Sequence, residues 1–354
     1  GASDVHTLGT VIYWARRYSA VLRGQWWWWG PPIAVISLIF IALFLLSAGL
    51  DRIANPALAA HSWTTGRKKA RSKGQGAGGK ALGARGKEQG DSATEPVLWV
   101  EDLRVVFETR AGAGAAVDGV SFTLKPGERM GLIGESGCGK TTMASALMSM
   151  VRPPGRIDGG SVVLAGKDLL ALDDGELRRA RLKEIALVPQ AAMNALNPVL
   201  RIRDQIIDAI VAHEPNMSQQ ALDNMVERAL TQVGLPVTVA NRYPHQLSGG
   251  MKQRTAMAIS TVLRPKLIIA DEPTSALDVV VQRQVMLTLA KIQEELGAAT
   301  ILIGHDMGLI AQFSDTIGVL YAGKLVERGD IDDVLAAPCH PYTRLLIDSL
   351  PNLD

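Results

Sequence analysis

The sequence predicts an α/β domain that is built on a parallel β-sheet and preceded by one transmembrane helix. Three observations lead to this fold class. Strand patterns alternate with helical patterns from residue 97 onward, which is typical of βαβ units. The segment Gly134 to Thr142 fits the phosphate-loop pattern G-x-x-x-x-G-K-[ST] without a mismatch. Further upstream, Ile33 to Leu50 forms a run of 18 residues without a charge.

Length, cysteine content and charge limit the function classes. The chain has 354 residues and 47% hydrophobic content, enough to bury at least one full-sized core. Its two cysteines, Cys138 and Cys339, are too few for a disulfide framework, which favours a reducing compartment. Eight Lys or Arg and one acidic residue lie between Gly66 and Gly90, so the rest of this +2 chain carries −5. An acidic remainder argues against a nucleic-acid-binding domain.

The N-terminal segment has the composition of a membrane span. Four tryptophans, Trp26 to Trp29, precede Gly30-Pro31-Pro32 and the uncharged run. With the prolines the run reaches about 20 residues, or ~30 Å as a helix, which is enough to cross a bilayer. It is too long and begins too far from the N-terminus for a signal peptide, and a buried core helix remains the alternative. More basic residues follow the run than precede it, so everything after Leu50 is expected in the cytosol.

The composition divides the chain into three parts. Residues 1–60 hold the predicted span at about 31–50, residues 61–95 form a basic linker, and residues 96–354 form the globular domain. The linker is rich in glycine and poor in apolar residues, so it is expected to be a flexible tether. Its charge suits contact with anionic lipid headgroups, while nucleic-acid binding and a simply solvated linker stay open. Because the chain begins with Gly rather than Met, it is expected to be a fragment or a processed chain.

The elements of the globular domain follow from periodicity and turn residues. Two long strands joined by a loop at Arg110 to Ala116 come first. The predicted strands are Val97–Phe107, Val117–Leu124, Met130–Ile133, Ser161–Leu164, Ile185–Val188, Leu267–Ala270, Thr300–Ile303 and Thr316–Leu320. The predicted helices are Thr141–Met150, Ile202–Ala212, Ser218–Val233, Met251–Leu263 and Val279–Leu296. Residues 195–262 contain helical patterns only, which predicts an inserted helical subdomain.

The phosphate loop has the residues that nucleotide binding needs. Gly134, Gly137 and Gly139 let successive N–H groups turn toward phosphate oxygens, and the following helix N-terminus adds positive potential. Lys140 is expected to reach the β- and γ-phosphates, and the Thr141 hydroxyl can ligate Mg²⁺. The remaining loop residues expected at the nucleotide are Ser136, Cys138 and Thr142. The alternative is a glycine-rich turn that binds nothing.

Two adjacent carboxylates end a strongly apolar strand. Lys266 to Asp278 reads Lys-Leu-Ile-Ile-Ala-Asp-Glu-Pro-Thr-Ser-Ala-Leu-Asp. Asp271 is placed to hold Mg²⁺, and Glu272 to orient or deprotonate an attacking water. An isolated Asp-Glu pair is usually a solvated loop, but this pair follows a buried strand in a chain that also has a phosphate loop.

A third motif, Leu247 to Met251, reads Leu-Ser-Gly-Gly-Met and directly precedes a predicted helix. Ser248, Gly249 and Gly250 offer a hydroxyl, exposed backbone donors and a helix N-terminus, which suit a second anion site. Taken alone, the segment is an ordinary helix cap.

In this order, the three motifs resemble those of the ATP-binding-cassette ATPases, and the resemblance covers residues 97–350. It implies a parallel core sheet, an antiparallel β subdomain and an inserted helical subdomain. In that family two cassettes pair head to tail, so Ser248 and Gly250 would act on the ATP held by the partner's phosphate loop. Gln190 matches the glutamine that touches Mg²⁺ and faces the permease, and His305 matches the histidine that contacts the γ-phosphate.

Two further positions follow from the same resemblance. Ser275 to Asp278 matches the loop that links the two ATP sites. Phe107 is the candidate for stacking on the adenine ring, although it can instead be a core residue at the end of its strand.

Three shorter motifs resemble the dipeptide, oligopeptide and nickel importer branch of the family. They are Leu196-Asn197-Pro198, Tyr243-Pro244-His245-Gln246 and Pro338-Cys339-His340-Pro341-Tyr342-Thr343. The N-terminal segment, with Thr7-Leu8-Gly9-Thr10 and Gly49-Leu50-Asp51, resembles the last membrane helix of that branch's permease. One membrane helix cannot form a pathway, so partners must supply the rest. Because the chain stops at Asp354, no iron-sulfur cluster is expected.

The resemblance implies an ATPase subunit that powers import of short peptides or a related small solute, with ATP and Mg²⁺ as cofactors. Its expected partners are permease subunits, a second cassette, identical or related, and an extracytoplasmic substrate-binding protein. The expected location is the cell (inner) membrane, with the ATPase domain on the cytoplasmic face and no nucleic acid bound. The alternatives are an exporter half-transporter and a soluble cassette ATPase of DNA repair or translation.

Cys138 lies inside the phosphate loop, where the helix N-terminus and Lys140 can lower its pKa. That predicts inhibition by thiol alkylators and protection by ATP. An inert small side chain is the alternative.

Overall fold

The computed structural model describes residues 34, 35, 37, 38, 42, 95–109, 112–190, 195–275 and 277–349. The chain divides into two units, Gly1–Glu88 and Gln89–Asp354. The few described residues of the first unit are helical and exposed. The predicted span and basic linker otherwise lie outside the described residues. Among the residues that are described, no helix combines the length and apolar character needed to cross a membrane.

A six-stranded sheet forms the centre of the second unit, in the order β10-β9-β3-β8-β7-β6. Its strands are β3 (Arg129–Ile133), β6 (Ile185–Val188), β7 (Leu267–Asp271), β8 (Ala299–Ile303), β9 (Thr316–Tyr321) and β10 (Lys324–Asp330). The five strands from β9 to β6 run parallel. The edge strand β10, which was not predicted, is antiparallel to β9, so the sheet is parallel only over the five strands from β9 to β6. The short turn between β9 and β10 can only reverse the chain, whereas a parallel neighbour needs a longer crossover.

The central strands are continuous apolar runs because both faces of the sheet are covered. Along β7, Leu267 and Ile269 belong to one apolar cluster, and Ile268 and Ala270 belong to the other. This alternation follows from the period of two in a strand. The sheet therefore separates two cores, and every residue of β7 is buried.

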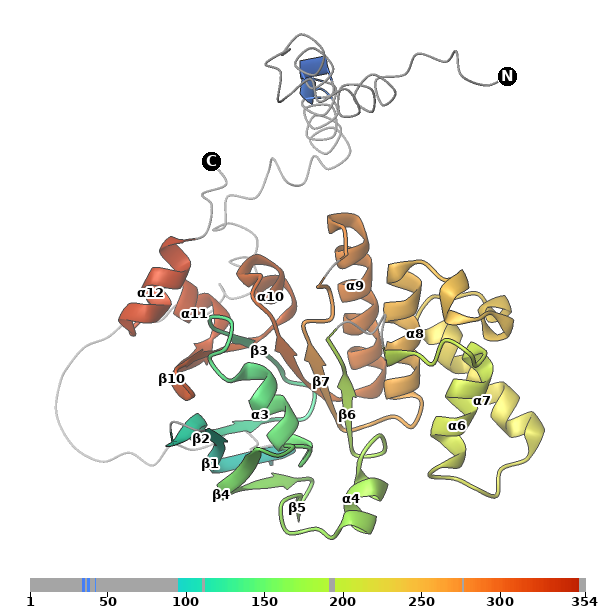
Figure 1. Ribbon diagram of the computed structural model, residues 1–354, viewed down its shortest axis with the longest axis horizontal. Helices are drawn as coiled ribbons and strands as arrows, with labels where there is room; N and C mark the ends of the chain where they lie inside the picture. The colour runs from blue at the N-terminus through green and yellow to red at the C-terminus, as the bar shows by residue number, and fades with distance from the viewer. Residues whose placement is uncertain are drawn as a thin grey trace, which may run out of the picture. The chain divides into compact units, whose positions relative to one another are not determined.

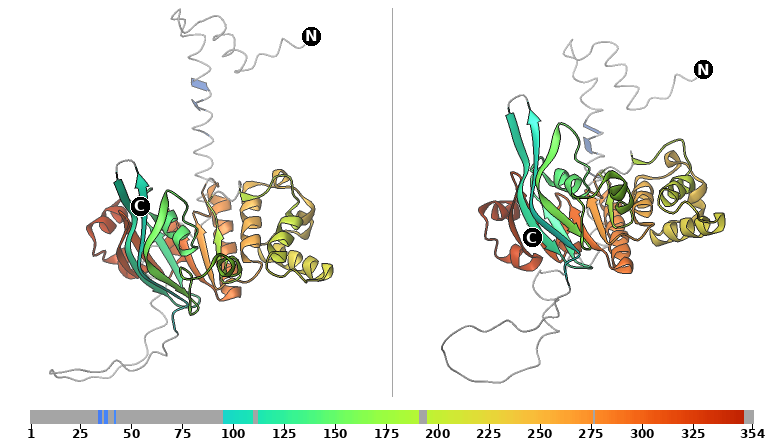
Figure 2. Two further views of the ribbon diagram at one scale, coloured as in Figure 1. Left: turned by 60° about the horizontal axis from the view of Figure 1, so that its bottom comes forward. Right: turned by 90° about the horizontal axis from the view of Figure 1, so that it is seen from below.

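A four-stranded antiparallel sheet, in the order β2-β1-β4-β5, packs on one face. Its strands are β1 (Leu98–Thr109), β2 (Gly112–Leu124), β4 (Gly155–Leu164) and β5 (Lys167–Asp168). The loop predicted from Arg110 to Ala116 is wrong from Gly112 onward, because Phe107 pairs with Gly114 and Thr109 with Gly112. Pairing along the whole of β1 outweighs the weak strand preference of glycine and alanine. Figure 2 shows the long β1–β2 hairpin at the side of the unit.

The helices were predicted best where the apolar period is long. The α-helices are α3 (Lys140–Leu147), α4 (Asp174–Ala180), α6 (Ile202–Val211), α7 (Gln219–Gln232), α8 (Gly249–Thr261), α9 (Val279–Leu296), α10 (Met307–Phe313), α11 (Ile331–Ala336) and α12 (Pro341–Asp348). Two 3₁₀ turns, η1 (Val237–Asn241) and η2 (Pro244–Gln246), lie between α7 and α8. Between residues 195 and 261 the described chain contains only helices and turns, as expected. Figure 1 shows α6, α7 and α8 gathered at the β6 end of the unit.

Local caps set the helix boundaries. The Ser218 side chain accepts a hydrogen bond at the start of α7, and Asp278 does the same at the start of α9. At the other end of α9, Gly297 adopts the left-handed conformation that commonly ends a helix, with φ of 62°.

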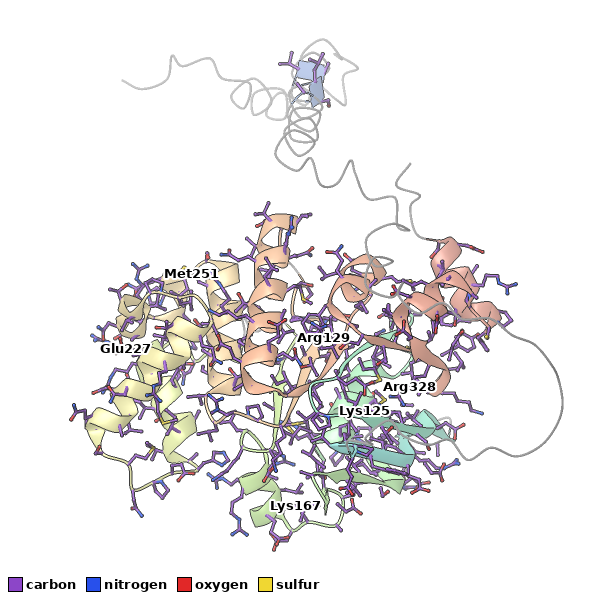
Figure 3. All side chains as sticks on the ribbon, turned by 180° about the vertical axis from the view of Figure 1, so that it is seen from behind. Lys125, Arg129, Lys167, Glu227, Met251 and Arg328 are labelled. Carbon is purple, nitrogen blue, oxygen red and sulfur yellow. The ribbon has the colours of Figure 1, made fainter. Side chains whose placement is uncertain are left out.

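The two sheets are also joined by an arginine of the edge strand. The Arg328 guanidinium of β10 donates to the backbone oxygen of Thr123 in β2 and to Glu128 Oε1, at 3.4 Å. It lies 6.0 Å from the centre of the Phe122 ring, which suits a cation–π contact. Figure 3 shows Arg328 next to Lys125, at the end of β2.

Candidate nucleotide-binding and catalytic site

The order of the parallel strands places the motifs side by side. The phosphate loop follows β3, His305 follows β8, Asp271 and Glu272 end β7, and Gln190 follows β6. These four strands are neighbours in the sheet and end at the same edge. In open α/β sheets, ligands bind outside the carboxyl ends of the strands. Segments separated by up to 171 positions in the sequence, from Gly134 to His305, therefore meet at one edge.

Two glycines of the phosphate loop cannot be replaced without moving its backbone. Gly134 has a φ of 151°, and a Cβ there would lie 2.2 Å from the Leu320 carbonyl oxygen. Gly139 has a φ of 112°, and its Cβ would lie 2.2 Å from the Ala116 carbonyl oxygen. The loop is thus pressed against the end of β9 and against β2, with Ser136 and Gly137 exposed at its tip.

Lys140 is buried and bonded to its own loop. Its Nζ donates to the carbonyl oxygens of Gly134 at 2.7 Å and Glu135 at 2.8 Å. The ammonium group lies inside the curl of the loop, where the phosphates of a nucleotide would bind. When a nucleotide binds, its charged phosphate oxygens can accept from Lys140 in place of these two carbonyl oxygens. Hydrogen bonds between charged groups are stronger.

Cys138 is also buried, 3.9 Å from the Lys140 ammonium nitrogen. Burial raises the pKa of the thiol, and this effect exceeds the opposing influence of Lys140. The expectation of a lowered pKa is therefore wrong, because the helix N-terminus and Lys140 do not compensate for the loss of water around the sulfur.

Thr141 and Asp271 bring two hard oxygen ligands together. The Thr141 hydroxyl lies 3.4 Å from Asp271 Oδ1 and donates to it. Asp271 is 4% exposed, and burial raises the pKa of its carboxyl, as does neighbouring Glu272, while the Thr141 hydrogen bond opposes the rise. A buried carboxylate without a cation is costly, and Mg²⁺ prefers such oxygen ligands. The residues therefore fit a magnesium ion that also uses oxygens of the nucleotide.

No group of three or more His, Cys, Asp and Glu side chains that could bind a metal occurs in the described parts of the chain.

Glu272 is held between Gln190 and His305. Gln190 Nε2 donates to Glu272 Oε2 at 2.8 Å, and His305 Nδ1 lies 3.6 Å from Glu272 Oε1. The backbone of Glu272 is left-handed, with φ of 43°, and its N–H donates to the Ile303 carbonyl oxygen of β8 at 2.9 Å. Left-handed glutamate is strained, and such strain gathers at functional positions. The strained turn points the carboxylate at residues from both neighbouring strands.

A cavity of about 140 Å³ lies beside this group. Glu272, Ser275, Gln282, His305 and Asp306 contribute polar side chains to its wall. It has room for several water molecules. The carboxylate therefore borders a space from which a water can attack.

Phe107 lines a second hollow, of about 380 Å³, that also borders α3. Thr141, Thr142 and Ser145 of α3 form the opposite wall, together with Arg152. The ring also packs on Gly155, where a Cβ would come within 2.7 Å of it. Phe107 thus packs near the end of its strand and also borders a hollow next to the phosphate loop, and its stacking on adenine stays a prediction.

The segment Ser248 to Gly250 lies apart from the phosphate loop of its own chain. Ser248 Oγ accepts from the Met251 N–H at 3.4 Å and caps α8. A Cβ on Gly250 would lie 2.4 Å from Val281 of α9, so glycine allows α8 and α9 to approach closely. In Figure 1, β6 and β7 separate α8 from α3. Asp278 likewise caps α9 and accepts from the Val281 N–H at 2.9 Å.

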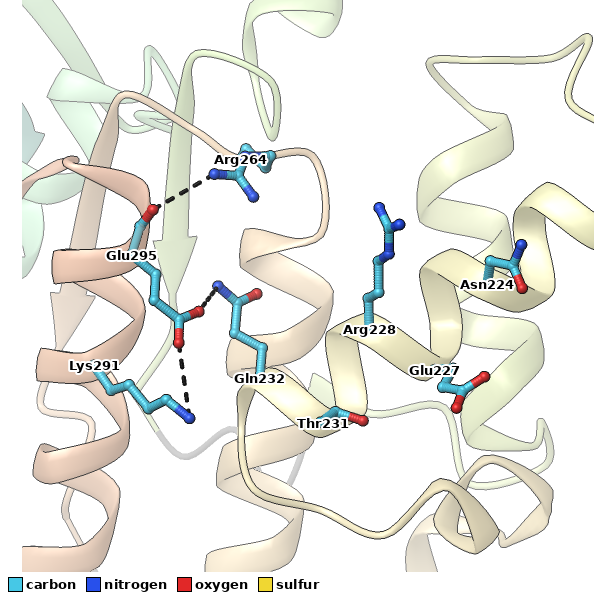
Figure 4. Close-up of a pocket in the computed structure, with 8 residues that line it drawn as sticks. All are labelled: Asn224, Glu227, Arg228, Thr231, Gln232, Arg264, Lys291 and Glu295. Carbon is cyan, nitrogen blue, oxygen red and sulfur yellow. Dashed lines mark hydrogen bonds and ion pairs between the residues drawn. The ribbon is translucent and has the colours of Figure 1, made fainter.

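A larger cavity, of about 800 Å³, lies between α7 and α9 (Figure 4). Glu295 accepts hydrogen bonds from Gln232 at 3.0 Å and, at its backbone oxygen, from Arg264 at 3.5 Å. Lys291 forms an ion pair with the same carboxylate at 3.7 Å. Gln232, Arg264, Lys291 and Glu295 thus bind one another across this cavity and join α9 to α7 and to the end of α8.

Comparison with known proteins agrees with this geometry. The ABC transporter family model matches residues 117–275, which hold the phosphate loop, Gln190, Ser248 and both carboxylates. The dipeptide transport ATP-binding protein DppD of Bacillus subtilis is 41% identical over 263 residues, which are 73% of this chain and 78% of the relative. The chain belongs to the ABC transporter ATPases. This ABC ATPase binds and hydrolyses ATP.

Other comparisons indicate the oligopeptide/dipeptide branch of this family. A model for the C-terminal region of oligopeptide/dipeptide transporters matches residues 326–354. The oligopeptide transport ATP-binding protein OppD of Escherichia coli is 40% identical over 262 residues, 73% of this chain and 77% of the relative. The ATP-binding cassette MJ0796, solved as a dimer in a post-hydrolysis state bound to ADP and Pi, shares 27% identity with a TM-score of 0.59. The similarity covers 66% of this ABC ATPase and 98% of MJ0796.

One contact at the site was not foreseen. The Glu135 N–H in the phosphate loop donates to the Tyr342 hydroxyl at 2.9 Å. Tyr342 belongs to the Pro-Cys-His-Pro-Tyr-Thr motif, which indicated the branch but gave no sign of a role near the nucleotide. The two residues are 207 positions apart, and only the position of α12 brings them together.

Proposed function

We propose that this ABC ATPase powers the import of short peptides or a related small solute across the cell membrane. The observation that carries the proposal is the meeting of four strand ends around Glu272, combined with relatives that are named as peptide transport proteins. The branch model at residues 326–354 supports the cargo class.

Glu272 is the general base in this proposal. It accepts a proton from a water in the adjoining cavity, and Gln190 and His305 orient its two carboxylate oxygens. Asp271 and Thr141, with Gln190, would hold Mg²⁺, which supplies positive charge to the phosphate oxygens. Lys140 holds the phosphates, and Phe107 offers its ring face to adenine.

A second cassette completes each ATP site. Ser248, Gly249 and Gly250 lie on a helix N-terminus of the kind that binds anions, but away from the phosphate loop of the same chain. Pairing with an identical or related cassette would bring this segment onto the partner's nucleotide. Asp278, in the loop linking the two sites, would then lie at the interface.

The membrane side of the proposal rests on sequence. The uncharged run from Ile33 to Leu50 is long enough to span a bilayer, and the basic linker after it suits the cytoplasmic face. We assign it as a permease-like helix attached to the ATPase. Other permease subunits and an extracytoplasmic substrate-binding protein would complete the importer.

The test is ATP-driven release of a labelled di- or tripeptide from proteoliposomes that contain the chain, its permease and the substrate-binding protein. The ATPase domain faces outward, ATP is added outside, and peptide-loaded binding protein is enclosed inside. Release of peptide to the outside medium, dependent on ATP, supports import and should be lost in Glu272→Gln. The control Glu101→Gln changes an exposed glutamate of β1 and should transport normally. ATP-driven movement in the opposite direction would identify an exporter instead.

A further inference from the structure

The C-terminal helix α12 touches the phosphate loop through a single hydroxyl group. Tyr342 is 8% exposed, and its hydroxyl accepts the Glu135 N–H at 2.9 Å. The carbonyl oxygen of the same residue, Glu135, accepts a hydrogen bond from Lys140 Nζ at 2.8 Å. The peptide groups on both sides of Glu135 are therefore held, one by the C-terminal helix and one by the phosphate-binding lysine.

Tyr342 is itself held in place from two directions. Glu327 of β10 accepts the Cys339 N–H at 2.7 Å with one oxygen and the His340 N–H at 3.0 Å with the other. His340 then caps α12, because its Nδ1 accepts the Tyr342 N–H at 3.1 Å. The Glu327 carboxylate thus fixes Cys339 and His340, the two residues that directly precede α12.

The aromatic ring has a separate support. The rings of Tyr342 and Tyr321 lie 4.5 Å apart between centroids, with 43° between their planes. Tyr321 is the last residue of β9. The residue before it in the same strand, Leu320, lies against Gly134 of the phosphate loop. The ring packing holds the side chain, and the hydroxyl alone makes the hydrogen bond to the loop.

We propose that Tyr342 is a positioning residue for nucleotide binding: its hydroxyl fixes Glu135, and thereby the curl of the phosphate loop around Lys140. The chain Glu327, His340, Tyr342, Glu135 connects the branch-specific C-terminal region to the nucleotide. Through it, the C-terminal region sets the affinity for ATP. The proposal rests on ATP hydrolysis alone and does not depend on the cargo, so it can fail while peptide import stands.

The effect should fall on binding rather than on the chemical step. Without the hydroxyl, the Glu135 N–H loses its acceptor and the loop must be ordered by the nucleotide itself. The loss of one such hydrogen bond corresponds to about a fivefold weaker affinity. Glu272, Gln190 and His305 lie on other strands, so the turnover number should stay within about twofold of the parent.

The experiment measures KM and kcat for ATP, with the chain assembled with its permease in lipid, for Tyr342→Phe and Tyr321→Phe. The two changes remove the same atom from neighbouring rings, but it is the Tyr342 hydroxyl that accepts the Glu135 N–H of the loop. The expected result is a KM raised about fivefold in Tyr342→Phe, with kcat kept, and parental values in Tyr321→Phe. An unchanged KM in Tyr342→Phe, or the same rise in both variants, would overturn the proposal.

A second variant, at Glu327, tests the proposed connection independently, and melting temperatures exclude a general loss of stability as the cause. Glu327→Gln leaves one of the two amides without a strong acceptor and should raise the KM for ATP as well. If Glu327 acts through Tyr342, the double variant should be no worse than Tyr342→Phe alone, since coupled residues are not additive. Full additivity of the two changes would contradict the proposed connection. Melting temperatures, expected within about 3 °C of the parent, show that the variants are folded.

Discussion

Gln190 donates a hydrogen bond from Nε2 to Glu272 Oε2 at 2.8 Å, and so joins the ends of two neighbouring strands, β6 and β7. The carboxylate already has a fixed orientation before a nucleotide binds. The partner on its other side, His305, comes from β8. Glu272, the proposed catalytic base, thus depends on three adjacent strands for its direction.

Gln190→Ala removes this orienting hydrogen bond and leaves the phosphate loop intact. We expect kcat for ATP hydrolysis to fall about tenfold, as a bond worth about 1.4 kcal/mol would imply, with binding of ATP in the absence of Mg²⁺ nearly unchanged. Steady-state hydrolysis and equilibrium nucleotide binding check this. Gln232→Ala, in the α7–α9 joint, is the matched control and should keep kcat. Weakened binding with normal kcat would contradict the assigned role.

Asp271→Asn should stabilise the nucleotide-free protein. Burial raises the pKa of Asp271, so the folded state loses stability when this group ionises as the pH rises. The asparagine removes that cost, and its side-chain oxygen can still accept from Thr141. We expect a higher melting temperature at pH 7 to 8, by about 2–4 °C per kcal/mol gained, with the difference vanishing toward pH 4.

The same variant should lose the response to magnesium. Parent protein is expected to gain thermal stability when Mg²⁺ is added with ATP, because a bound cation compensates the buried charge. Equal Mg²⁺-dependent shifts in parent and Asp271→Asn would show that Asp271 does not contact the metal.

The sequence was informative where the pattern is local. The apolar run of β7 and the period of α9 are each visible in a single window, and the structure confirms both elements. The strand order β3-β8-β7-β6 is not local. It was not predicted, since alternation of strands and helices does not fix which strands are neighbours.

Other features depend on tertiary contacts and had no local signal. Gly112 to Ala116 has the composition of a loop, yet it pairs with β1 and is a strand. The edge strand β10 and the helix α12 were not predicted, and the contact of Tyr342 with Glu135 depends on both. The pKa of Cys138 could not be foreseen either, because burial is a property of the folded chain.

Cys138 should react slowly with alkylating agents at neutral pH. Its pKa is raised by burial, so the rate of inactivation by iodoacetamide should rise about tenfold per pH unit from pH 7 to 9 without a plateau. The measurement uses a Cys339→Ser background, since Cys339 is exposed. Bound ATP should slow the reaction further. A rate that levels off below pH 8 would indicate a lowered pKa and contradict the structure.

Gly139→Ala should disable the phosphate loop. The new methyl group would lie 2.2 Å from the Ala116 carbonyl oxygen, at a φ of 112° that alanine rarely adopts. We expect at least tenfold weaker ATP binding and a loss of stability of about 1–3 kcal/mol. Gly114→Ala is the control, because no atom lies within 4 Å of a Cβ there. Equal ATP affinity in the two variants would refute the steric argument.

The most direct test of the account is ATP hydrolysis by the chain assembled with its permease in lipid, parent against Glu272→Gln, with and without peptide-loaded binding protein. We predict that the parent rate rises with loaded binding protein, and that Glu272→Gln loses about 10²- to 10⁴-fold of it while still binding ATP. Hydrolysis that survives in Glu272→Gln would contradict the assignment of the catalytic base, and a parent rate indifferent to loaded binding protein would contradict peptide import.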